Sequence, residues 1–159
     1  MRIAPILSGL ALALAAVLPG HVLAEDTQEL KWQFMPGIPR PIEVAVVSGD
    51  PSQPGPYVIR YRMPSGMRLA PHSFPDQREL TVVKGIYWIV PGENYNWRDM
   101  TEYPAGSVIV REAGKPYFTW ARTAVVLEEK GTGPSEIQYV HPEDDPRNKK
   151  KRRGAAAAE

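Results

Sequence analysis

Short apolar runs separated by turn residues fill the chain between residues 25 and 147. No long segment repeats apolar residues at the i, i+3, i+4, i+7 spacing of an amphipathic helix, so we expect few helices. The runs are instead rich in β-branched and aromatic residues, which favour strands. This pattern predicts strands at residues 42–47, 57–62, 79–84, 86–90, 107–111, 123–128 and 136–140.

Glycine and proline mark the ends of these runs. The stretch PSQPGP at residues 51–56 predicts a long turn, whereas Lys84-Gly85 is short enough to close a hairpin. Many short strands at regular spacing predict an antiparallel sandwich or barrel. A chain of 159 residues can bury the core of one such domain and is short for two.

The first 24 residues have the pattern of a cleavable signal peptide. Arg2 precedes an apolar run, and the sequence Val22-Leu23-Ala24 offers small residues for cleavage after Ala24. A membrane anchor is the alternative, but the apolar run is shorter than the roughly 20 residues that span a bilayer. We therefore expect a periplasmic or secreted protein whose domain occupies residues 25–147.

The C-terminal end differs in charge from the rest of the chain. Residues 147–153 include six basic residues, and four alanines follow shortly after them. Residues 25–146, in contrast, contain 12 basic and 17 acidic residues, so the predicted domain is acidic and nucleic acid is not an expected partner. Residues 148–159 are predicted to be a disordered tail, with contact to anionic surfaces as the alternative. The chain has no cysteine, which excludes disulfides and thiol ligands.

Two motifs in the middle of the chain resemble those of the cupins. The first cupin motif, G-x5-H-x-H-x3,4-E-x6-G, is matched in spacing by Gly66, His72, Phe74, Arg78 and Gly85. The second is matched by YPAGSVIVREAGKPYFTW at residues 103–120, in which Tyr117 stands where family members have histidine. The resemblance implies an all-β fold, the antiparallel jelly-roll barrel called the double-stranded β-helix, and also a homodimer.

The resemblance also implies a divalent metal held by three histidines and one glutamate, but the sequence departs from that pattern. Of the four positions, only His72 keeps its ligand, because phenylalanine has no donor atom and arginine is cationic. A protein-bound zinc or iron ion needs three or four ligands. We therefore expect no metal cofactor; the alternative is Zn, Mn or Fe bound by His72 and Glu79, with Tyr117 as a third ligand if a β-bulge turns Glu79 inward.

The resemblance places His72, Phe74, Arg78 and Tyr117 together inside the barrel as a ligand pocket. A guanidinium beside an imidazole and a phenol suits a small anionic molecule. Alternatively, Arg78 forms an internal ion pair with Asp76 or another acid. The sequence thus predicts an exported cupin that binds a small molecule without a stoichiometric metal. The alternative is a cupin enzyme, an oxidoreductase or isomerase, that uses an altered metal site or acid–base catalysis.

Overall fold

The computed structural model describes residues 29–148. The predicted signal peptide and all but the first residue of the predicted tail lie outside the described residues. Asn148, that first residue, donates a side-chain hydrogen bond to the carbonyl of Pro142. No helix within residues 29–148 is long and apolar enough to cross a membrane.

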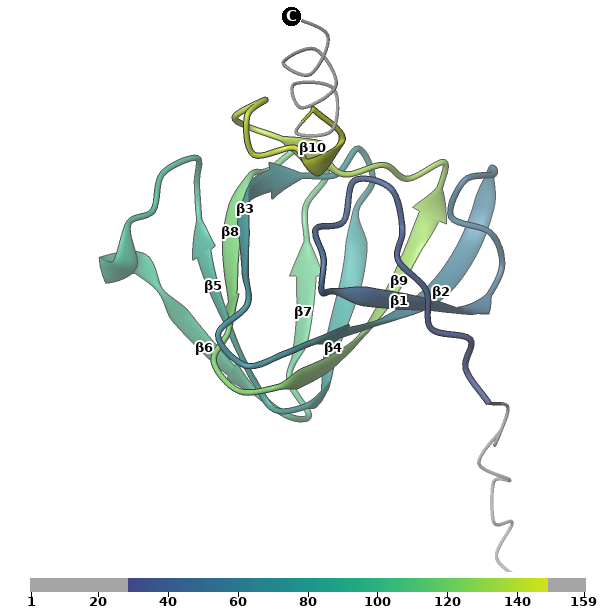
Figure 1. The fold of residues 1–159 in the computed structure, drawn as a ribbon, viewed down its shortest axis with the longest axis horizontal. Coiled ribbons are helices and arrows are strands. Elements are labelled where there is room, and N and C mark those ends of the chain that lie inside the picture. Colours follow the sequence, from purple (N-terminus) through teal and green to yellow (C-terminus); the bar gives the residue numbers. More distant parts are fainter. Residues whose placement is uncertain (1–28, 149–159) are drawn as a thin grey trace, which may run out of the picture.

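Two five-stranded antiparallel sheets face each other across the core (Figure 1). The first sheet has the order β1 (Glu43–Ser48), β2 (Gly55–Met63), β9 (Val125–Gly133), β4 (Arg78–Lys84) and β7 (Val108–Arg111). The second has the order β10 (Gln138–Tyr139), β3 (Arg68–Ser73), β8 (Tyr117–Ala121), β5 (Ile86–Pro91) and β6 (Thr101–Pro104). A single 3₁₀ turn, η1 (Trp97–Asp99), precedes β6. This arrangement confirms the predicted all-β jelly-roll barrel.

The hairpin predicted at Lys84-Gly85 is wrong. β4 pairs with β7 and β9, whereas β5 pairs with β6 and β8, so Gly85 carries the chain from one sheet to the other. Its φ of +88° favours glycine, and a Cβ there would lie 2.3 Å from the carbonyl oxygen of Ala124. Gly85 does join β4 and β5 by a short connection, but these two strands lie in different sheets.

Several predicted strand boundaries also change. β3, β6 and β8 were absent from the predicted set, because Pro71 and Pro104 lie in the first two and β8 is a short aromatic run. β9 continues five residues beyond the predicted end at residue 128. The prediction stopped at a pair of glutamates, but Glu129 is buried in the structure and the strand passes through it.

Alternate residues of each strand point into the barrel, as a pleated strand requires. On β4 the buried residues are Arg78, Leu80 and Val82, and on β9 they are Val125, Leu127 and Glu129. Most inward residues are apolar and form a large core cluster, beside which Val44, Tyr57 and Ile59 form a smaller one. The buried Arg78 and Glu129 therefore stand out as polar groups inside an apolar barrel.

The outer face of the second sheet carries its own aromatic cluster. Trp88 and Trp120 are opposite each other on β5 and β8, and their rings meet edge to face with centroids 4.8 Å apart. Arg68 and Arg122 lie over the faces of Trp120 and Trp88, respectively. These tryptophans thus pack outside the barrel and do not line its interior.

Candidate functional site

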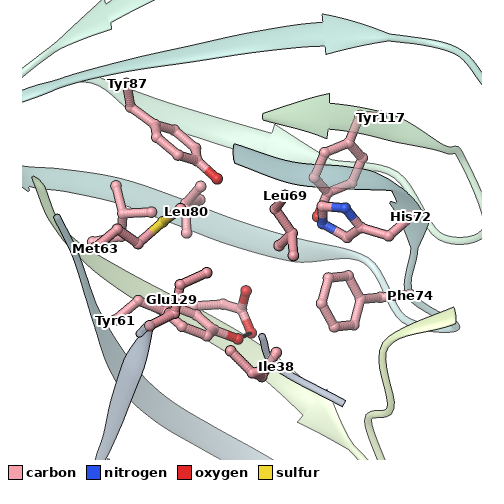
Figure 2. A pocket seen from close by; sticks show the side chains of 12 residues that line it. Ile38, Tyr61, Met63, Leu69, His72, Phe74, Leu80, Tyr87, Tyr117 and Glu129 are labelled. Atoms are coloured by element: carbon pink, nitrogen blue, oxygen red, sulfur yellow. Dashed lines mark hydrogen bonds between the residues drawn. The ribbon is translucent and has the colours of Figure 1, made fainter. Parts of the chain in front are cut away.

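The four predicted pocket residues are all buried in the barrel. His72 on β3 is directly opposite Tyr117 on β8, and their ring centroids are 4.4 Å apart. The ring of Phe74 meets that of His72 edge to face at 5.5 Å. Figure 2 shows these three side chains together on one side of a cavity. Arg78 lies beyond that lining and contacts it through Glu129 and the ring of Phe74.

The cavity is small and mostly apolar. Its volume is about 30 Å³, enough for one or two water molecules. Its polar groups come from four kinds of side chain, the imidazole, the tyrosine hydroxyls, a thioether and one carboxylate. The lining residues are Ile38, Ile42, Tyr61, Met63, Leu69, His72, Phe74, Leu80, Tyr87, Tyr117, Leu127 and Glu129.

His72 is neutral in the folded protein. Burial lowers the pKa of its imidazole to about 3, and the charges of Arg111 and Arg78 act in the same direction. Nδ1 lies 2.7 Å from the carbonyl oxygen of Ala70, so Nδ1 carries the hydrogen and donates it. The other ring nitrogen, Nε2, is therefore the acceptor that His72 offers to a ligand.

The tyrosines of the cavity are neutral as well. Burial raises the pKa of Tyr87 to about 12 and raises the pKa of Tyr117 further. Both hydroxyl groups therefore keep their protons and act as hydrogen-bond donors at neutral pH. Together with His72 they give the cavity one good acceptor and two donors.

Arg78 is held by two acids. Its Nη1 donates to Glu129 Oε1 at 2.8 Å, and its Nη2 donates to Asp76 and, at 2.6 Å, to the hydroxyl of Ser135. Burial opposes the charge on Arg78, but attraction to Glu129 and nearby tyrosines raises its pKa above the ordinary value. The predicted alternative, an internal ion pair with Asp76, is therefore found in the structure. Both Nη groups of Arg78 are thus occupied, whereas its buried Nε–H has no hydrogen-bond partner among residues 29–148.

Glu129 is the site residue that the sequence prediction missed. Its carboxylate accepts hydrogen bonds from Tyr57 at 3.1 Å and Tyr61 at 3.3 Å in addition to Arg78, and it points into the cavity (Figure 2). Burial raises the pKa of this carboxyl, and Arg78 opposes the rise. The signal was the alternation of Val125, Leu127 and Glu129, which places all three on one face of a strand.

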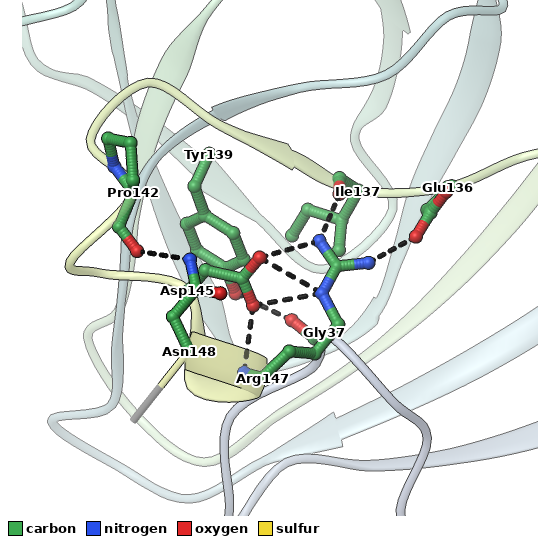
Figure 3. Close-up of polar contacts among 8 residues, drawn as sticks. All are labelled: Gly37, Glu136, Ile137, Tyr139, Pro142, Asp145, Arg147 and Asn148. Atoms are coloured by element: carbon green, nitrogen blue, oxygen red, sulfur yellow. Dashed lines mark hydrogen bonds and ion pairs between the residues drawn. The ribbon is translucent and has the colours of Figure 1, made fainter. Parts of the chain in front are cut away.

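Two segments close the upper end of the barrel, as drawn in Figure 1. The hydroxyl of Tyr139 donates to the carbonyl of Gly37 at 2.7 Å, which ties the C-terminal segment to the loop at residues 35–38. Arg147 joins Asp145, Glu136 and the carbonyl of Ile137 (Figure 3). Ile38 from the tied loop lines the cavity, so these contacts also hold part of its wall in place.

The residues do not fit a divalent metal ion. His72 offers one nitrogen, Tyr117 keeps its proton, and the Glu129 carboxylate is already neutralised by Arg78. Glu79 does not reach His72, because it lies on the outer face of β4, where its carboxylate is 3.5 Å from Lys130 Nζ. No group of three or more His, Asp or Glu side chains within residues 29–148 is arranged to hold a metal.

No family model and no curated protein matches the sequence. Solved structures match in shape. An RmlC-like cupin from Shewanella frigidimarina has a TM-score of 0.54 at 9% identity, over 67% of this chain and 86% of that chain. KdgF from Halomonas sp. has a TM-score of 0.51 at 14% identity, over 65% of this chain and 86% of that one.

Salicylate 1,2-dioxygenase from Pseudaminobacter salicylatoxidans has a TM-score of 0.53 at 15% identity. The match covers 65% of this chain and 32% of the dioxygenase, so this chain spans about a third of that enzyme. Identities at this level show a common fold and leave activity open. The fold of this chain is that of a small single-domain cupin, a double-stranded β-helix.

Proposed function

We propose that this protein is an exported, metal-free cupin that binds a small molecule inside its barrel. The observation that supports the proposal most strongly is the convergence of His72, Tyr87 and Tyr117 on a cavity that is otherwise largely apolar. A few placed polar groups on an apolar lining are typical of small-molecule sites. These groups leave hydrogen-bonding capacity directed into the cavity.

The size of the cavity sets a condition on the ligand. A second cavity of about 70 Å³ lies beside the first and shares Ile38, Tyr61, Phe74 and Glu129 as its wall. The loop at residues 35–38 lines this second cavity too. A ligand of more than two or three heavy atoms therefore requires this loop to move outward, which joins the two spaces.

Acid–base catalysis receives less support from the site. A general acid or base works best when its pKa lies near the operating pH. Burial instead moves the pKa of His72 down to about 3 and the pKa of Tyr87 up to about 12. These groups are suited to hold a ligand by hydrogen bonds.

The test is native mass spectrometry of protein purified from the exported fraction, followed by release of any bound molecule with denaturant. We expect a bound small molecule in the wild type and its loss in Leu69→Phe, because Leu69 lines the cavity. Val110→Phe is the matched control, since Val110 is 61% exposed on the outer face of β7. A folded wild type that never carries a molecule would contradict the proposal.

A further inference from the structure

Arg111 is a half-buried cation that forms no ion pair with an acid of the described residues. It ends β7, and its guanidinium carbon lies 3.1 Å from the centroid of the Tyr117 ring. Among residues 29–148 no carboxylate lies within salt-bridge distance of it, although its cross-strand neighbour Arg78 has two. No acid of residues 29–148 thus forms an ion pair with this charge, although the Glu129 carboxylate is near enough to act on Tyr87 and Tyr117.

Hydroxyl groups surround this cation. Tyr87 and Tyr103 are directly opposite each other on β5 and β6, and both interact electrostatically with Arg111, as does Tyr117. Thr119 lies on the inward face of β8, two residues along from Tyr117. Its Oγ1 is fully buried and lies near the hydroxyl of Tyr87. Two neighbouring hydroxyl groups can donate to the same ligand oxygen or to different ones.

We propose that this group of side chains, the Arg111 cluster, is a binding site for a small oxyanion such as a carboxylate. The cluster consists of Arg111, Tyr87, Tyr103, Tyr117 and Thr119. A guanidinium pairs with an oxyanion through two parallel N–H donors, and hydroxyl groups supply further donors to the remaining lone pairs. The inference rests on the proposed function and names the charged group of its ligand.

The interior of the barrel is divided by charge, which explains why the anion binds here and not at Arg78. Asp76 and Glu129 occupy the Nη donors of Arg78 and would repel an anion. The Arg111 cluster contains one cation, four hydroxyl groups and no acid. Burial lowers the pKa of Arg111, and a bound anion would oppose that effect.

The test measures binding of sodium acetate and sodium phosphate by calorimetry, against sodium chloride at equal ionic strength. Arg111→Gln should weaken acetate or phosphate binding about tenfold or more, as expected for the loss of a charge-assisted hydrogen bond. Arg122→Gln is the matched control, because Arg122 also lies over an aromatic ring, 5.3 Å from Trp88, but on the outer face. Thr119→Val, which keeps all charges, should weaken binding a few-fold.

Equal affinities in the two arginine variants, or no anion binding by the wild type, would overturn the Arg111 site. A co-purifying neutral molecule that Arg111→Gln retains in full would also overturn it, while ligand binding in the barrel would stand. Conversely, acetate binding that depends on Arg111 in a protein that carries no molecule after export would support the anion site and contradict the proposed function.

Discussion

The guanidinium carbon of Arg78 lies 3.4 Å from the centroid of the Phe74 ring. Both residues occupy positions at which the cupin resemblance implies metal ligands, and here the two replacements contact each other. A cation over an aromatic face stabilises a folded protein by about 0.5–2 kcal/mol. At these positions the barrel thus carries the positive charge of an arginine side chain, with Asp76 and Glu129 as counter-ions.

Removing one of these counter-ions should destabilise the fold strongly. Glu129→Leu leaves Arg78 with one acid and removes the acceptor of Tyr57, so we expect a loss of about 3 kcal/mol in the free energy of unfolding. Glu128→Leu is the matched control. The carboxylate of Glu128, the neighbour of Glu129 in sequence, pairs with Arg60 on the outer face, so we expect a loss of about 1 kcal/mol or less. Urea denaturation measures both, and equal losses would contradict the prediction.

Restoring the ligand pattern should create a metal site. The triple variant Phe74→His, Arg78→Glu, Tyr117→His adds two imidazoles and a carboxylate beside His72 and removes the cation. We expect it to bind about one Zn or Mn ion per chain and to unfold at a higher temperature when the ion is present, since the ion binds only the folded state.

The control for the metal prediction is the double variant Phe74→His, Tyr117→His, in which Arg78 remains. Its guanidinium should still exclude the ion, so metal analysis should find no stoichiometric uptake. Two results would contradict the prediction: a tightly bound metal ion in the wild type, or a folded triple variant that binds no metal. Either would show that these four positions do not converge as the metal ligands of a cupin do.

His72 should make stability depend on pH. The unfolded chain protonates histidine near its ordinary pKa of 6.5, but the folded protein does so only near 3. Because the unfolded state binds more protons between these values, stability should fall as the pH drops from about 6.5 toward 3, by up to about 1.4 kcal/mol per unit. His72→Gln should show a flatter dependence in chemical denaturation, and identical slopes would refute the assignment.

The contact of Tyr139 with Gly37 should control access to the cavity. Tyr139→Phe removes the hydroxyl that holds the loop, at a cost of about 1 kcal/mol. Hydrogen exchange should speed up at the amides of Ile38 and Ile42, which bond to carbonyls within residues 35–39. Tyr95→Phe removes a hydroxyl from an exposed side chain and should leave these rates unchanged.

The alternation of buried positions made much of the barrel predictable from the sequence. The cupin resemblance, in contrast, implied that His72, Phe74, Arg78 and Tyr117 face into the barrel, and all four are buried although they come from different strands. The pairing of the strands was harder to predict from the sequence. Nothing local to Lys84-Gly85 distinguishes a hairpin from a corner between sheets, since that choice depends on which distant strands lie alongside.

The polar part of the site required the tertiary structure. Glu129 lies in a charged stretch, Glu128-Glu129-Lys130, that is typical of an exposed strand end, and only the distant Arg78, Tyr57 and Tyr61 make its burial favourable. Arg111 was predicted as the end of a strand, but the absence of an acid around it becomes visible only when β5, β6 and β8 are placed beside it.

An ion held by side chains is exchangeable, and its occupancy follows the supply of metal in the surroundings. The guanidinium of Arg78 is attached to the chain and cannot be withdrawn by a chelator or replaced by a competing cation. A barrel in which the charge of Arg78 is covalently fixed therefore keeps that charge on folding, whether metal is scarce or abundant in the surroundings.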